Sequence, residues 1–128
     1  MGISNLFKGA QIKTVRKGFY GIYCLYYRFG KLCHDDELME MCRKMGRHVK
    51  QMETTKLEGE YEKLSYDIET RVQMKPENVR MAFDKKLQFL KTQARTMRIN
   101  PMRLFKRTGL TDQDIEEFDK DLSESESK

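Results

Sequence analysis

Apolar residues recur at alternating spacings of four and three between positions 38 and 52, and this period constrains the fold more than any other feature of the chain. The members of this stripe are Leu38, Cys42, Met45, Val49 and Met52. Such spacing puts every member on one side of an α-helix that packs against another helix. Asp35 and Asp36 stand just before the run, where a carboxylate can cap a helix. The sequence therefore predicts a helix that begins at these aspartates and buries the stripe.

The period is interrupted after Met52, because the next apolar residues in step come one position late. They are Leu57, Tyr61, Leu64, Ile68 and Val72. Thr55 followed by Glu58 has the form of a capping box, which favours a turn near residues 53–56 and a new helix. A continuous helix with a one-residue phase shift would give the same pattern. Of the two interpretations, we favour the break.

A further helix is predicted from Pro76, because proline is well suited to the first helical position. Its apolar stripe consists of Val79, Phe83, Leu87, Leu90, Ala94 and Met97. Asn100 and Pro101 are expected to end it, and residues 102–108 then form a short helix. Gly109 stands where a glycine commonly follows the end of a helix.

The C-terminal part of the chain predicts one last helix. Thr111 and Asp114 resemble a cap, and the apolar residues after them fall at helical spacing. These anchors are Ile115, Phe118 and Leu122. The segment Ser123–Lys128 alternates serine with charge and has no apolar side chain, so we expect it to be a disordered acidic tail.

Residues 18–30 are aromatic or apolar on every side of a helix, which is typical of a buried segment. One interpretation makes this segment the central helix of a bundle. In the other, it docks on a partner or a lipid surface together with the amphipathic residues 3–12. The candidate docking residues are Leu6, Phe7, Phe19, Tyr20, Tyr23, Tyr26 and Tyr27.

These elements predict an all-α protein, a small helical bundle of four or five helices that contains a long helical hairpin. Residues 35–74 and the helix at 76–99 are expected to pack antiparallel, with the aromatic segment as third partner. A chain of 128 residues suffices for one core. We therefore expect three parts, which are a basic amphipathic segment at 1–17, one helical domain at 18–122 and the tail at 123–128.

Charge is distributed very unevenly along the chain. Residues 1–34 hold six Lys or Arg and no acid, 75–108 hold ten against two acids, and 109–128 hold eight acids against two lysines. The strongest basic face is formed by Lys85, Lys86, Lys91, Arg95, Arg98, Arg103, Lys106 and Arg107. Such a face suits nucleic-acid backbone, anionic lipid or an acidic protein, and it is also typical of a plain solvated surface. The acidic residues 112–121 could also fold back and cover it.

Catalytic or metal-binding patterns are not apparent. Cys24, Cys33, Cys42 and His48 are spaced nine, nine and six apart, unlike the closely spaced pairs that hold zinc. Carboxylates fall mostly on a predicted solvated helix face, and neither a phosphate-binding loop nor a nucleophile motif is present. We expect no catalytic residue, no metal and no cofactor, and so a protein that is not an enzyme.

The sequence thus favours a non-enzymatic structural or assembly subunit that docks into a larger protein complex, cellular or viral, with a membrane surface as one setting. The alternative is a nucleic-acid backbone-binding protein that uses residues 85–107. Self-association through the heptad stripes is a further expectation. Three cysteines, an odd number, favour a reducing compartment, intracellular or inside a viral particle. No apolar run reaches the length of a membrane span.

Overall fold

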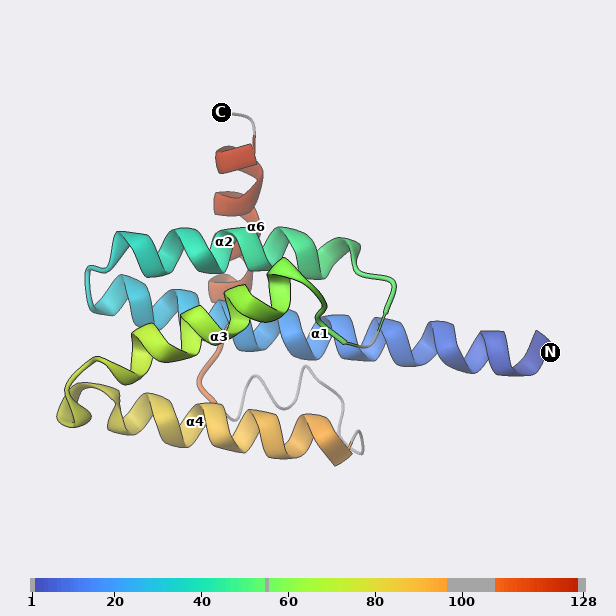
Figure 1. Ribbon diagram of the computed structural model, residues 1–128, viewed down its shortest axis with the longest axis horizontal. Helices are drawn as coiled ribbons and strands as arrows, with labels where there is room; N and C mark the ends of the chain where they lie inside the picture. The colour runs from blue at the N-terminus through green and yellow to red at the C-terminus, as the bar shows by residue number, and fades with distance from the viewer. Residues whose placement is uncertain (1, 55, 97–107, 127–128) are drawn as a thin grey trace.

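The computed structural model describes residues 2–54, 56–96 and 108–126, with side chains from residue 12 onward except at 14, 93–96 and 126. Over these ranges the chain is helical and has no strand, which confirms the all-α bundle. The helices are α1 (Gly2–Leu32), α2 (Asp36–Gln51), α3 (Glu60–Gln73), α4 (Glu77–Thr96) and α6 (Asp112–Glu126). Figure 1 shows them in order along the chain.

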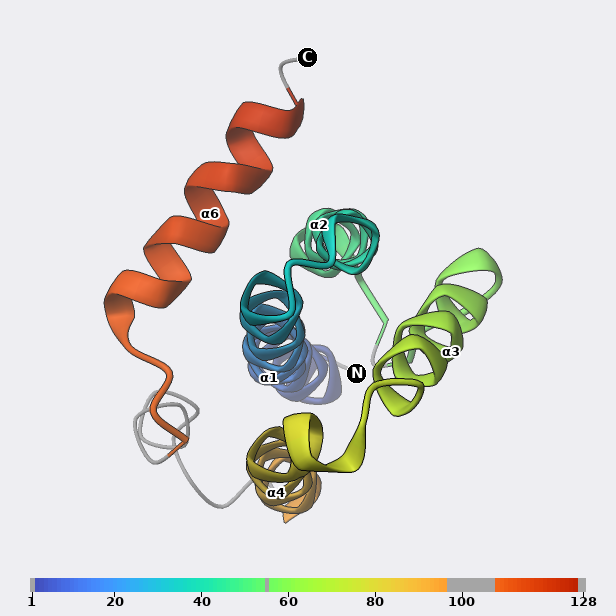
Figure 2. The same ribbon diagram turned by 90° about the vertical axis from the view of Figure 1, so that its left-hand side faces the viewer.

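Helix α1 is the centre of the bundle. It has 31 residues, so it is about 46 Å long at 1.5 Å per residue. Figure 2 looks along α1 and shows the other helices arranged around it. The helix continues through the predicted boundary between residues 17 and 18, and its first turns project beyond the other helices (Figure 1). The basic N-terminal segment is therefore a helical extension of the central helix.

Helices α1 and α2 form the main hairpin. Asp35 caps α2, since its carboxylate accepts a hydrogen bond from the backbone N–H of Leu38 at 3.1 Å. The predicted stripe is confirmed as core, because Leu38, Cys42, Met45 and Val49 are completely buried and Met52 nearly so. The stripe packs in the core of the same chain, so in this conformation it is not available for self-association.

The predicted break after α2 is confirmed. Helix α2 ends at Gln51 and α3 begins at Glu60. The proposed capping box does not start α3, however. The residue before the helix is Gly59, which has a φ of +59° and no side-chain cap, and Thr55 lies outside the described residues. Gly59 adopts this left-handed backbone readily because it lacks a Cβ.

A buried carboxylate ties α2 to α3. Asp35 accepts two hydrogen bonds from Arg71 at 2.8 and 2.9 Å and pairs with Lys75 at 2.8 Å. The hydrogen bond from Arg71 is the main cause that holds the pKa of Asp35 well below its usual range, against the opposite effect of burial. The N-terminus of α2 is thereby fixed to the C-terminal end of α3.

Helix α4 packs on α1, which corrects the expected pairing with residues 35–74. The ring of Phe83 lies 4.5 Å from that of Phe29 and 5.2 Å from that of Tyr26, measured between centroids. Phe83, Leu87 and Leu90 are buried as predicted, whereas Val79 is 48% exposed. The aromatic rings of α1 let α4 bury more apolar area than the charged side chains of α3 would, so α4 packs on α1. Ala94 has no described side chain.

Helix α6 begins with the predicted cap. Thr111 Oγ1 accepts a hydrogen bond from the Asp114 N–H at 3.2 Å, and Asp114 accepts one from the Thr111 N–H at 2.8 Å. Phe118 and Leu122 are buried, as expected of anchors. The tail prediction is not confirmed, because α6 continues to Glu126 and residues 127–128 lie outside the described ones.

The segment between α4 and α6 is described only from Thr108. The predicted helix end at Asn100 and Pro101 therefore lies outside the described residues, as do Met97 and all of the short helix predicted at 102–108 except its last residue. Gly109 has a φ of +79°, the conformation expected of a glycine after a helix.

Candidate functional site

The aromatic segment of α1 forms the core of the bundle. Tyr23, Tyr26 and Tyr27 are buried, while Phe19 and Tyr20 are half-buried, so the internal alternative is the one that the structure supports. Burial raises the pKa of Tyr23 to about 12, and its hydroxyl donates a hydrogen bond to Ser65 at 2.9 Å. The docking prediction is corrected for the three buried tyrosines, which a partner cannot reach in this conformation.

Two other candidate docking residues belong to the projecting part of α1. Leu6 and Phe7 are helical, and their side chains lie outside the described ones.

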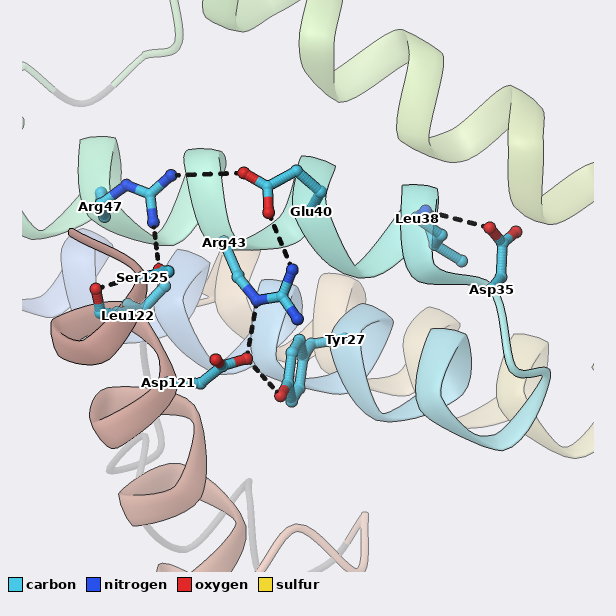
Figure 3. A network of polar contacts seen from close by, with 9 residues as sticks. All are labelled: Tyr27, Asp35, Leu38, Glu40, Arg43, Arg47, Asp121, Leu122 and Ser125. Atoms are coloured by element: carbon cyan, nitrogen blue, oxygen red, sulfur yellow. Dashed lines mark hydrogen bonds and ion pairs between the residues drawn. The ribbon is translucent and has the colours of Figure 1, made fainter. Parts of the chain in front are cut away.

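Helix α6 packs on a surface formed by basic and aromatic side chains of α1 and α2. Arg43 pairs with Asp121 at 2.7 Å, and the Tyr27 hydroxyl donates to the same carboxylate at 2.5 Å (Figure 3). Partial burial acts to raise the pKa of Asp121, but hydrogen bonds from Tyr27 and Arg43 keep it below its usual value. Arg43 also pairs with Glu40 at 2.8 Å.

Further ion pairs run along α6. They are Arg28–Asp114 at 3.4 Å, Lys31–Glu117 at 3.7 Å and Lys50–Asp119 at 2.9 Å. The hydroxyl of Tyr20 donates to Asp119, and Arg47 donates to the Ser125 hydroxyl at 2.8 Å. The partners of these pairs are partly exposed, so each is worth at most about 1 kcal/mol.

The acidic segment therefore folds back on a basic face other than the expected one. Its described partners belong to α1 and α2, and the fold-back onto residues 85–107 is corrected in this respect. Phe118 explains the choice, because its ring packs at 5.1 Å from Tyr20 and 4.9 Å from Tyr27. Burial of this ring is worth more than any one of the surface ion pairs.

The predicted anion-binding face is only partly described. Lys85 and Lys86 are exposed on α4, and Lys91 pairs with Glu69 of α3 at 3.1 Å. Arg95 is helical without a described side chain. The remaining members lie outside the described residues: Arg98, Arg103, Lys106 and Arg107.

An apolar groove with a volume of about 480 Å³ lies between the end of α1 and the start of α4. We call it the α1–α4 groove, and it is lined by Leu25, Arg28, Phe29, Leu32, Cys33, Lys75, Pro76, Val79, Ala82, Phe83 and Lys86. Leu32 is 77% exposed, although it is a large apolar side chain. Three cations and no carboxylate stand among the lining residues. The groove thus offers an apolar floor with a positively charged border.

A second hollow, of about 290 Å³, lies between α1 and α2. We call it the cationic hollow, and it is lined by Lys13, Arg16, Lys17, Tyr20, Val49 and Lys50. Sequence reasoning noted the basic opening of the chain but did not join it to Lys50. The spacing of Lys13, Lys17 and Tyr20 by four and three, which places them on one helix face, was the signal available.

The structure gives no sign of a membrane span or a metal centre in the part of the chain that it describes. No described helix is long and apolar enough to cross a bilayer. No group of three or more His, Cys, Asp or Glu side chains with the geometry of a metal site occurs among the same residues.

Comparison with protein-family models, with curated proteins and with solved structures found no match for this chain.

Proposed function

We propose that this protein is a non-enzymatic helical subunit that docks into a larger protein assembly through the α1–α4 groove. The observation that carries the proposal is the groove itself, an apolar depression of about 480 Å³ with an exposed leucine at its border. Apolar surface of this kind, bordered by polar groups, is typical of interaction sites. The occupant is a segment of a partner protein, namely an acidic amphipathic helix.

Charge complementarity supports this occupant. Lys86 lines the groove and has no ion pair among the described side chains. Arg28 and Lys75 also line it, each with one carboxylate partner outside the lining, Asp114 and Asp35 respectively, and no carboxylate lines the groove itself. Helices commonly bind in grooves through apolar residues three and four positions apart, with charges on the flanks.

The chain also contains an example of the same recognition within itself. Helix α6 places Phe118 and Leu122 among apolar side chains, while its carboxylates meet basic residues of α1 and α2. A partner helix with this pattern would satisfy the α1–α4 groove in the same way.

A second candidate function is binding of nucleic-acid backbone by the face at 85–107. It is favoured by Lys85 and Lys86, which are adjacent and exposed on α4. Because Lys86 also lines the groove, a salt dependence of binding does not separate the two functions. Lys85 does not line the groove, so replacing Lys85 does separate the two functions.

Site-specific photocrosslinking in the cells that produce the protein tests the proposal. A photoreactive residue replaces Val79 at the groove or, as a control, the exposed Tyr66 on α3. We expect a protein of discrete mass to crosslink at position 79 only, through an acidic amphipathic helix identified by mass spectrometry. The crosslink should survive nuclease and disappear with Ala82→Glu, which places a negative charge in the groove.

Matched variants distinguish the outcomes. Lys85→Glu should leave this crosslink intact, since Lys85 lies outside the groove. Equal crosslinking at positions 66 and 79 would refute the docking site. Recovery of nucleic acid that is lost with Lys85→Glu and kept with Ala82→Glu would establish the second candidate instead.

A further inference from the structure

The cationic hollow gathers like charges that repel one another. Lys13, Arg16 and Lys17 of α1 meet Lys50 of α2 around a volume of about 290 Å³, and no carboxylate is among the lining residues. Lysines four positions apart on a helix, as Lys13 and Lys17 are, destabilise it slightly. An arrangement of this kind is explained if an anion offsets the repulsion.

One carboxylate offsets part of this charge from outside the lining. Asp119 of α6 pairs with Lys50 at 2.9 Å and also accepts a hydrogen bond from Tyr20. No pair involving Lys13 or Lys17 is found among the described side chains.

Stabilisation of the C-terminal end of α2 explains the positions of only some of these cations. Arg16 donates through Nε to the carbonyl oxygen of Met52, directly after α2, and Lys50 belongs to the last turn of α2. Cations at these places stabilise the negative end of a helix. Lys13 and Lys17 have no such role, because they lie in the interior of α1.

The Arg16 side chain is held in place by one of its nitrogens. Its Nε is engaged with Met52, and a guanidinium has five N–H donors, so further donors remain for a ligand. Guanidinium groups bind phosphate through two parallel hydrogen bonds, while lysines act as point charges. Lys50 is held in a similar way, at 5.3 Å from the centre of the Tyr20 ring.

We infer that the cationic hollow binds a phosphate monoester through Arg16, Lys13, Lys17 and Lys50. The volume of the hollow, about 290 Å³, is close to the lower end of pockets that hold small ligands, about 300 Å³. It therefore accommodates a phosphate together with part of the group that carries it, and the half-buried ring of Tyr20 supplies an apolar wall for that group.

The same phosphate chemistry occurs in two sources, a phosphorylated small molecule in solution and the headgroup of a phosphoinositide lipid. The inference is independent of the α1–α4 groove, because no residue lines both.

Titration calorimetry of the full chain with soluble inositol 1,4,5-trisphosphate tests the inference. A parallel arm uses phosphatidylcholine vesicles with and without phosphatidylinositol 4,5-bisphosphate. We expect the soluble compound to bind, and Lys13→Gln with Lys17→Gln to weaken binding about tenfold or more, because each lost charge-assisted contact has a large effect. Binding to the lipid-containing vesicles as well assigns the headgroup source, and binding of the soluble compound alone assigns the other.

The control is a variant with the same change in net charge elsewhere. Lys44 and Lys63 are exposed on α2 and α3 and line neither hollow nor groove, so Lys44→Gln with Lys63→Gln should change binding less than about twofold. Arg16→Lys keeps the positive charge but removes the planar guanidinium that can form two parallel hydrogen bonds with phosphate, so this variant should bind more weakly.

Three results would overturn the inference. They are no binding of the soluble compound, an equal loss in the two double variants, and, when a single-stranded oligonucleotide is titrated in the same way, binding of the oligonucleotide alone. Each variant carries only exposed or half-exposed replacements, and an unchanged helical circular dichroism spectrum verifies that it folds.

Discussion

Replacing Gly46 by alanine sets two opposite effects against each other. Gly46 lies inside α2, where alanine favours the helix over glycine by about 1 kcal/mol. A Cβ at this position would lie 2.7 Å from Cζ of Phe118 and 3.1 Å from Cδ1 of Leu122. Real Cβ atoms essentially never come as close as 2.7 Å to another heavy atom, so α2 and α6 would have to move apart.

The cost of the steric clash should exceed the gain in helix propensity. Phe118 is completely buried between the rings of Tyr20 and Tyr27, so it cannot turn away. Overpacking of a filled core costs about 1–3 kcal/mol. Gly46→Ala should therefore lower the free energy of unfolding by up to about 2 kcal/mol, after the gain in helix propensity is subtracted.

Urea unfolding, followed by far-UV circular dichroism, measures this change. Gly18→Ala is the matched control, since nothing lies within 4 Å of a Cβ at Gly18 in α1. It should raise the free energy of unfolding by up to about 1 kcal/mol.

A double variant tests the cause. Phe118→Leu removes the ring atoms that the new methyl group would meet, so in this background Gly46→Ala should become neutral or stabilising. If Gly46→Ala stabilises the unaltered protein as much as Gly18→Ala does, the close approach of α2 and α6 is refuted.

Three further predictions follow from the buried groups. Asp35→Asn, which removes the buried negative charge that pairs with Lys75 and Arg71 and leaves Arg71 only its pair with Glu37, should cost about 2–3 kcal/mol at neutral pH in urea unfolding. Because the folded pKa of Asp35 is lowered, its contribution is present above the unfolded value of about 3.9 and is lost as the pH falls below it, so the difference between the two proteins should shrink in acid. In an alkaline titration followed by tyrosinate absorbance, four of the six tyrosines should ionise only as the protein unfolds, since burial raises the pKa of each. These four are Tyr20, Tyr23, Tyr26 and Tyr27. A thiol reagent should modify the half-buried Cys33 well before Cys24 and Cys42, because burial raises the pKa of both buried thiols; equal rates at all three would contradict this packing.

Much of the candidate site could not be read from spacing along the chain. The cationic hollow joins Lys13 and Lys17 to Lys50, and the α1–α4 groove joins Leu32 to Val79. These pairs come from different helices, and no local pattern states which helices will be neighbours. Tyr23 and Tyr26 were open to two interpretations because an aromatic segment has the same composition in a core and at an interface.

The sequence by itself determined which face of α2 is buried and where some of the helices begin or end. The stripe from Leu38 to Met52, the cap at Thr111 and the break near residues 53–56 are confirmed, because they depend on side-chain period and on hydrogen bonds between near neighbours. Only the tertiary structure decided which helices pair. Helix α4 packs on α1, and α6 packs on the basic face of α1 and α2. This pairing depends on buried aromatic area and on contacts between residues far apart in the chain.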